Sequence, residues 1–332
     1  MSVSVLKPGL LSTLQDSGRH GHAAIGVGRA GVMDIPAWQL ANALVGNRGD
    51  EAAIECTLLG PTLRFECPAW IALTGAPIRA HVGAHQLPPW TACQIPAGSV
   101  LRLGGMAVGC RSYLAVRGGF DVAPVLGSRS SDLHARLGHD GGRALQAGDV
   151  LPIGPAGATS GSEALDKVRI MSWQLDPQPW FDFAGEPVML LRGSHWSQLD
   201  EVSQARLHGA SFSISKDSNR TASRLDGQTL HLRTPLELIS EAALPGTMQL
   251  PPSGQPIVLM AEAPVTGGYP RIGQVAAVDL ARMAQRRPGD AVCFRLGTLD
   301  QAMARLAERE QALGALLGHI RQRLQHDGYT RT

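Results

Sequence analysis

Residues 71–82 read Ile-Ala-Leu-Thr-Gly-Ala-Pro-Ile-Arg-Ala-His-Val, which are two short apolar runs separated by Gly75 and Pro77. Runs of about four to eight residues between such breakers are typical of β-strands. Similar runs recur along the chain, at residues 99–104, 111–120, 168–173, 187–193, 211–215, 230–234, 236–240 and 256–262. Together with 39 glycines and 22 prolines, they predict a mainly β protein and not a helical bundle.

A few segments predict helices instead. Asp34 suits an N-cap, Pro36 fits the first turn that follows, and Gly46-Asn47 ends the segment. A second helix is expected at residues 278–286, before Pro288-Gly289, and a short helical turn at 132–137. The tail from Thr298 has apolar residues at helical spacing, which predicts a packing helix: Leu299, Met303, Leu306, Leu313, Leu316, Leu317, Ile320 and Leu324.

The length of 332 residues suits two ordinary domains. Small, polar, glycine- and proline-rich residues around 153–167 predict a linker between two β-barrel halves. We therefore expect an N-terminal domain at 1–152, a C-terminal domain at 168–297, and a C-terminal helix and tail at 298–332.

Composition argues against several classes of protein. Charged residues make up 17% and the net charge is +2, without a basic run of the kind that binds nucleic acid. No signal peptide is visible and no apolar stretch reaches about 18 residues, so no membrane association is expected. The five cysteines are odd in number and show no C-x-x-C spacing, which predicts reduced, buried thiols in a cytoplasmic protein.

Several catalytic motifs are missing from the chain. The only lysines are Lys7, Lys167 and Lys216, and none lies in a phosphate-binding loop or a biotin-carrying hairpin. His81 and His85 are four residues apart, but their segment reads as strand and turn, so no metal site is expected. The glycines of residues 26–31 match G-x-G-x-x-G without the preceding buried strand that a dinucleotide site requires. We therefore expect no cofactor bound by this chain alone.

Polar residues concentrate in glycine-rich turns. Asp16, Asp34, Glu55 and Glu241 are candidate acids or bases, and neighbouring arginines could bind a carboxylate through paired hydrogen bonds. Turn glycines, satisfied caps and surface ion pairs would explain each segment better than a binding site when it is taken alone. The number of such segments favours a polar binding cleft.

The motifs together resemble a known family. Residues 14–22 and 26–34, LQDSGRHGH and GVGRAGVMD, resemble the Q-D-x-G-R-x-G and S-G-x-M-D runs that open the biotin-dependent carboxyltransferase-like, urea-amidolyase-related family. The resemblance continues to about residue 296, through ANALVGN, IECTLLGPTLRF, LTGAP, YLAVRGGF, VLGSRSSDLHARLGHDGGRALQAGD, LPGTMQLPPSGQPIVLMAE and TGGYPRIGQVAAVDLARMAQRRPGD.

This resemblance implies two cyclophilin-like β-barrel domains and a role as one subunit of an ATP-dependent 5-oxoprolinase complex, which opens the lactam 5-oxoproline to glutamate. The partners would be 5-oxoprolinase subunits A and B, with B the most direct, and ATP would be used through them; no stand-alone activity is expected. We expect four catalytic residues: Asp16, Asp34, Glu55 and Arg129. Substrate-binding residues are expected at Gln15, Arg19, Gly75, Arg117, Ser128, Ser130, Arg220, Arg224, Gln249, Thr266, Gly267, Gly268 and Tyr269.

Two segments depart from the family pattern. Asn219 stands where an aspartate is usual, in a run that also lacks the usual Met-Gly pair. Val265 replaces a threonine and Glu262 an aspartate before Thr266-Gly267-Gly268-Tyr269. Two other functions stay open: a biotin-dependent carboxyltransferase acting on urea or a related amide, and a non-catalytic regulatory partner of a subunit-B-like kinase inhibitor.

Overall fold

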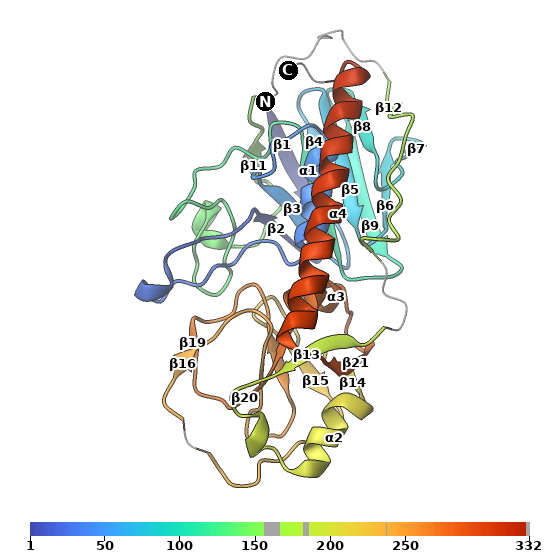
Figure 1. The fold of residues 1–332 in the computed structure, drawn as a ribbon. Helices are drawn as coiled ribbons and strands as arrows, with labels where there is room; N and C mark the ends of the chain where they lie inside the picture. Colours follow the sequence, from blue (N-terminus) through green and yellow to red (C-terminus); the bar gives the residue numbers. More distant parts are fainter. Residues whose placement is uncertain (156–166, 182–185, 237, 330–332) are drawn as a thin grey trace. The chain divides into compact units, whose positions relative to one another are not determined.

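The computed structural model describes residues 1–155, 167–181, 186–236 and 238–329. The chain forms two compact units, and neither is continuous in sequence. The first comprises residues 1–18, 34–182 and 312–332, and the second comprises residues 19–33 and 183–311. Figure 1 shows the strands and helices of both.

The first unit contains two antiparallel six-stranded sheets. One has the order β11 (Val150–Pro152), β1 (Ser2–Lys7), β4 (Thr62–Phe65), β9 (Val100–Met106), β6 (Ile78–Val82), β7 (His85–Gln86). The other has the order β12 (Arg169–Ile170), β8 (Ala92–Ile95), β5 (Ala69–Gly75), β10 (Arg111–Val116), β3 (Ala53–Thr57), β2 (Leu11–Gln15). The expected barrel of the first half is therefore built as two stacked sheets.

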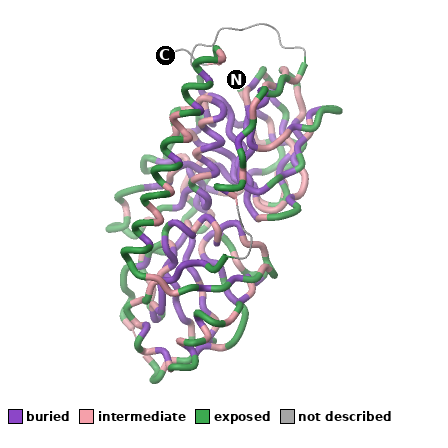
Figure 2. Tube along the Cα trace, turned by 45° about the vertical axis from the view of Figure 1, so that its right-hand side comes forward, coloured by how far each residue is buried: buried purple, intermediate pink, exposed green. Residues whose placement is uncertain are grey.

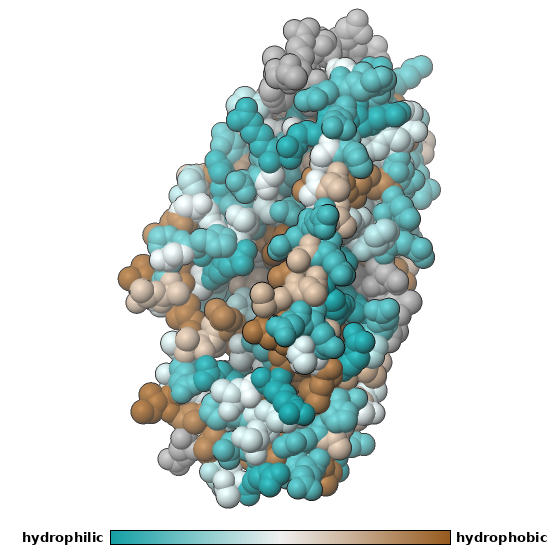
Figure 3. Space-filling model, viewed as in Figure 1, coloured by the Kyte–Doolittle hydropathy of each residue, from teal (hydrophilic) through white to brown (hydrophobic). Residues whose placement is uncertain are grey.

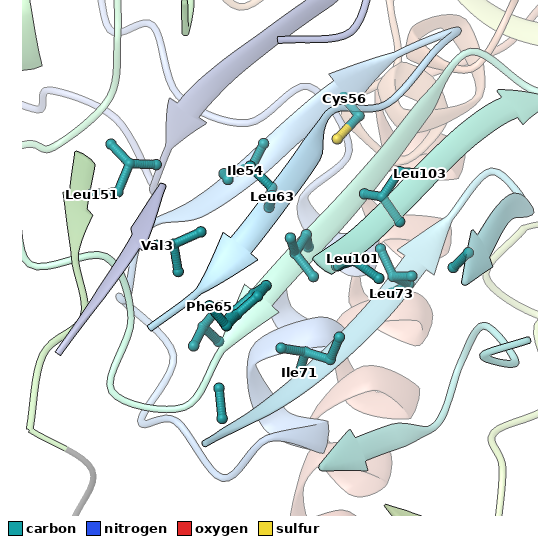
Figure 4. Close-up of a cluster of buried hydrophobic side chains, with 14 of the residues drawn as sticks. Val3, Ile54, Cys56, Leu63, Phe65, Ile71, Leu73, Leu101, Leu103 and Leu151 are labelled. Carbon is teal, nitrogen blue, oxygen red and sulfur yellow. The ribbon is translucent and has the colours of Figure 1, made fainter. Parts of the chain in front are cut away.

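The core of this unit lies between the two sheets. Val3 and Leu63 come from one sheet and Ile54 and Leu73 from the other, and all four are buried in one apolar cluster. Figure 4 shows these side chains meeting between the strands. Because side chains alternate along a strand, the residues between them point away from this core.

Helix α1 (Ile35–Leu44) packs against β5 and β10. Asp34 is its N-cap, and the carboxylate accepts a 3.1 Å hydrogen bond from the Ala37 amide. Pro36 lies in the first turn, where no amide hydrogen is required. The helix expected after Asp34 is confirmed.

The second unit contains a closed seven-stranded barrel. Its order is β13 (Val188–Arg192), β20 (Arg271–Val275), β17 (Thr247–Gln249), β18 (Ile257–Leu259), β15 (Ala222–Asp226), β14 (Ser211–Ile214), β21 (Ala291–Leu296). Strands β16 (Glu241–Ala242) and β19 (Thr266–Gly267) form a separate two-stranded sheet. A mainly β fold with a barrel and few helices is thus confirmed.

The helices of the second unit are short. The expected helix at 278–286 is present as a 3₁₀ turn, Ala277–Asp279, that continues into α3 (Leu280–Ala284). Helix α2 (Glu201–Gly209) was not predicted, because only Ser203 and Leu207 of its residues are buried and no apolar stripe marks it. Further 3₁₀ turns span Ala23–Ile25 and Trp196–Gln198 in this unit and His139–Gly142 in the first unit.

The expected C-terminal helix is confirmed as α4 (Leu299–His326), which contributes residues to both units. Leu313, Ile320 and Leu324 are buried, whereas Leu299 and Met303 are 63% and 59% exposed. Figure 2 shows buried and exposed positions alternating along the helix. The apolar spacing therefore marks a packing face over only part of its length.

Several expectations about segments were wrong. Residues 132–137 are a turn, since the Asp132 carboxylate accepts from the amides of His134 and Ala135 and Arg136 has a φ of 55°. Residues 230–234 and 236–240 contain no strand among the described positions, only an isolated bridge from Leu232 to Leu199. Strand β12 joins a sheet of the first unit.

The linear domain boundaries, 1–152 and 168–297, also differ from the observed units. Residues 19–33 pack with the second unit and residues 312–332 with the first, because contact between distant segments defines a compact unit. Most of the expected linker at 153–167 lies outside the described residues.

All five cysteines are free thiols, as expected, but Cys293 is exposed and Cys67 is half-buried. No helix in the described part of the chain is long and apolar enough to cross a membrane. Figure 3 shows exposed apolar side chains in small groups on a largely hydrophilic face.

Candidate functional site

Polar side chains line the outer face of one sheet in the first unit. Thr13 of β2, Glu55 of β3 and Tyr113 of β10 are direct cross-strand neighbours. The residues that alternate with them, Ile54 and Leu114, point into the apolar core. Strand periodicity therefore places these three polar side chains together on the face opposite the core.

Glu55 and Asp34 meet through the Tyr113 hydroxyl. That hydroxyl donates to Glu55 Oε2 at 2.8 Å and accepts from the Asp34 amide at 2.8 Å. Arg111 Nε lies 3.7 Å from Glu55 Oε1. Burial, followed by the charges of Glu55 and Asp34, raises the pKa of Tyr113 well above its usual value, so the phenol stays a donor.

Asp16, at the end of β2, holds the loop at residues 127–131. Its carboxylate accepts 2.5 Å hydrogen bonds from the Ser128 and Ser130 hydroxyls and from the Arg129 amide, and a 2.9 Å bond from the Gly18 amide. Four donors converge on this one carboxylate, which fixes the position of the loop. The geometry thus brings Asp16, Ser128 and Ser130 together, as a buried support for the loop.

Gln15 lies beside this loop and is fully buried. Its Nε2 donates to Thr13 Oγ1 at 3.1 Å and to the Ser131 carbonyl at 2.9 Å. Its Oε1 has no hydrogen-bond partner among the described residues. A buried acceptor without a partner costs about 1–3 kcal/mol, so Gln15 is a candidate position for a ligand contact.

The other predicted residues of the first unit have separate partners. Arg117 Nε donates to the Val45 carbonyl at 2.7 Å and Nη1 to the Tyr329 carbonyl at 3.1 Å, and burial lowers the Arg117 pKa to about 10. The Arg129 guanidinium donates to the Val122 carbonyl at 3.0 Å. Gly75 ends β5 with a φ of 76°. The structure does not bring these three residues to one point.

In the second unit, Arg220 forms a buried ion pair. Its Nε donates to Glu262 Oε1 at 2.6 Å, and the two side chains are only 1% and 2% exposed. Its Nη2 donates to the Gly31 carbonyl at 2.5 Å, which ties residues 19–33 to the barrel. Arg19, in the same segment, is also buried, whereas Arg224 is exposed. Arg220 is therefore paired inside the unit, whereas Arg224 lies on the surface.

The departure at Asn219 has a structural explanation. The Asn219 side-chain oxygen accepts from the Thr221 amide at 2.8 Å and the Ala222 amide at 3.1 Å. An aspartate oxygen would accept the same two bonds, so asparagine preserves this turn while removing a charge.

Gln249 lies against Gly267 of the predicted Thr266–Tyr269 segment. It is 3% exposed, and its Nε2 has no hydrogen-bond partner in the described part of the chain. A Cβ added at Gly267 would lie 2.5 Å from that nitrogen, so a larger residue would require the end of the buried Gln249 side chain to move. Thr266 and Gly268 are exposed, and Tyr269 is 46% exposed. These residues do form one local group.

Three residues that contact predicted site residues were not themselves predicted. Tyr113 and Arg111 lie against Glu55, and Glu262 pairs with Arg220. Tyr113 and Arg111 stand in an alternating strand pattern two residues apart, which would have placed them on the face of Glu55. Glu262 was noted only as a departure, and no local signal links it to Arg220, 42 positions away. Glu241 pairs with Arg271 instead of any predicted site residue.

No cluster of three or more histidine, cysteine, aspartate or glutamate side chains that could hold a metal occurs among the residues described. The predicted site residues offer hydrogen-bonding amides and hydroxyls, and carboxylates and guanidinium groups that are mostly paired with one another or with the backbone.

Comparison with known proteins shows the family of this chain. The model of the carboxyltransferase domain family, subdomains A and B, matches residues 25–296, and the chain belongs to this family. It is 39% identical to the C subunit of Escherichia coli 5-oxoprolinase over 303 residues, which are 91% of this chain and 93% of that protein. The C subunit of the Haemophilus influenzae 5-oxoprolinase is 35% identical over 88% of this chain and 90% of that protein.

A solved structure also matches. The crystal structure of K. lactis urea amidolyase superposes with a TM-score of 0.82 and 26% identity, covering 94% of this chain. This chain spans only 20% of that protein.

Proposed function

We propose that this chain is the C subunit of a 5-oxoprolinase complex that uses ATP to open 5-oxoproline to glutamate. The observation that carries the proposal is the 39% identity to the E. coli protein, which extends over nearly the full length of both chains. Separate A and B subunits would complete the complex, with B the direct partner. The three lysines lie outside any phosphate-binding loop, which supports ATP use on a partner.

Within this proposal, Gln249 and residues 266–269 contact the substrate. The buried, unpaired amide nitrogen of Gln249 suits a carbonyl or carboxylate oxygen, and 5-oxoproline carries both. Asp16 acts through the 127–131 loop, since its oxygens already accept four hydrogen bonds. Glu55 and Asp34 act through Tyr113 in the same way.

Reconstitution tests the function directly. The purified chain is mixed with candidate A and B subunits, ATP and 5-oxoproline, and glutamate is measured. Glutamate is expected only when all three chains are present. Glutamate formation that does not need this chain would refute the proposal.

The urea amidolyase match supports a second candidate, a carboxyltransferase acting on urea or a related amide with biotin carried by another protein. A carboxybiotin donor protein and a panel of amides test it, with transfer of the carboxyl group as the readout. Absence of transfer to every amide would exclude this candidate.

A purely regulatory binding role makes a different prediction. It requires a partner complex that survives replacement of Asp16, Arg129 and Arg220 by alanine while no turnover depends on them. Loss of turnover with an intact complex would exclude that role.

A further inference from the structure

A hollow of about 580 Å³ lies in the first unit, and none of the predicted site residues lines it. Its walls are the C-terminal half of α1, the loop at residues 46–50 and the last turns of α4. Sites for small molecules typically have volumes of about 300–1,000 Å³. The hollow is therefore large enough for a metabolite.

The loop that forms one wall is held in place by its neighbours. Asn47 Nδ2 donates to the Val116 carbonyl at 2.9 Å, and its Oδ1 accepts from the Gly118 amide at 2.8 Å. The Glu51 carboxylate accepts from the amides of Arg48 and Gly49 at 2.9 and 2.7 Å. The backbone of the wall is thus fixed before any ligand arrives.

The charged side chains that line the hollow have no such partners. Arg48 and Asp50 from the loop and Arg321 from α4 make no ion pair or side-chain hydrogen bond with any described residue. Gln39 and Gln325 also line the hollow without a side-chain hydrogen bond to the described residues. Asn47 and Glu51 use their side chains to hold the wall, whereas Arg48, Asp50 and Arg321 can bind a ligand.

These charges define a complementary ligand. Each guanidinium can bind one carboxylate through two parallel hydrogen bonds, and the Asp50 carboxylate can bind an ammonium group. Leu317, Leu324 and Ala43 supply apolar lining for an aliphatic body. A small molecule with two carboxylates and one ammonium matches this set.

We propose that the hollow is a binding site for an acidic α-amino acid, with Arg48, Arg321 and Asp50 as its charged contacts. The choice of glutamate rests on the proposed function, in which glutamate is the product. Glutamate would then bind this subunit at a second position, separate from the proposed substrate contacts at Gln249 and Thr266–Tyr269.

The first test is titration calorimetry of the isolated full-length chain with L-glutamate. Saturable binding is expected, and Arg48→Gln and Arg321→Gln should each weaken it by about tenfold or more. Arg102→Gln is the matched control, because Arg102 is another exposed arginine of the first unit that does not line the hollow. Equal weakening by the control, or no saturation up to about 10 mM glutamate, would overturn the proposal.

The second test separates an amino acid from a plain dicarboxylate. Glutarate lacks the ammonium group and should bind the natural chain several-fold more weakly than glutamate. Asp50→Asn should remove that preference, because the ammonium partner is lost. Equal affinity of both ligands for the natural chain would contradict the role of Asp50. Neither test needs subunits A and B, so failed reconstitution and failed binding are separate results.

Discussion

Replacing Arg220 by methionine should destabilise the second unit strongly. Arg220 and Glu262 have side chains only 1% and 2% exposed, and their atoms are 2.6 Å apart. Methionine fills similar volume but leaves the Glu262 carboxylate buried without its guanidinium partner. Breaking a buried ion pair from one side costs about 3–5 kcal/mol, and the Gly31 carbonyl loses a donor as well.

Urea unfolding of the full-length chain measures this cost, with circular dichroism as the signal and the midpoint and slope fitted for each variant. The control is the double variant Arg220→Met with Glu262→Leu, which removes both charges. Because a matched apolar pair is often as stable as a buried ion pair, the double variant should recover most of the loss. The single variant should also free residues 19–33, which limited proteolysis would detect.

A loss below about 1 kcal/mol for Arg220→Met would show that the pair contributes no more than an exposed one. A double variant as unstable as the single variant would show that the guanidinium acts through the Gly31 carbonyl and not through Glu262. Either result would refute the claim that the buried Arg220–Glu262 ion pair stabilises the second unit.

Asp16→Asn should lower the free energy of unfolding in urea by about 2–3 kcal/mol. The asparagine NH₂ group is a donor, so it cannot accept the hydrogen bonds that the carboxylate oxygens accept from Ser128, Arg129 and Ser130. Gly267→Ala should lower the melting temperature because its Cβ would lie 2.5 Å from Gln249 Nε2, and adding Gln249→Ala should restore it; no restoration would contradict the steric account. Burial alone would raise the pKa of Asp279, but hydrogen bonds from Arg305 and the Met189 amide outweigh burial and lower it. Asp279 therefore stabilises the folded state above about pH 4, and this stabilisation is lost as the pH falls through the lowered pKa. Arg305→Gln should flatten the acid side of a stability–pH curve, and an unchanged curve would refute the assignment.

Local patterns predicted the elements well where one physical signal was enough. Asp34 and Pro36 predicted the start of α1 because capping and a missing amide hydrogen are local requirements. Short apolar runs between glycines and prolines predicted the β fold for the same reason. Helix α2 was not predicted because few of its residues are buried. Helix α4 was predicted over its full length, although Leu299 and Met303 are exposed.

The candidate site was predicted less completely. Asp16, Ser128 and Ser130 were all selected, but their shared contact depends on segments more than 110 positions apart, such as Asp16 and Ser128 at a separation of 112. Arg117 was selected as a substrate residue, yet it bonds the Val45 and Tyr329 carbonyls. A residue type indicates what a side chain can bind, and only the fold decides which partner reaches it.

The amino-acid sequence by itself determined the mainly β class, the N-cap of α1, the long C-terminal helix and membership of the family, because these depend on local periodicity and on motif spacing. The tertiary structure decided the rest. It placed residues 19–33 with the second unit and 312–332 with the first. It also paired Glu55 with Tyr113 and Arg220 with Glu262. Such pairings follow from which buried surfaces pack together, and no local pattern records the free energy of contacts between distant segments.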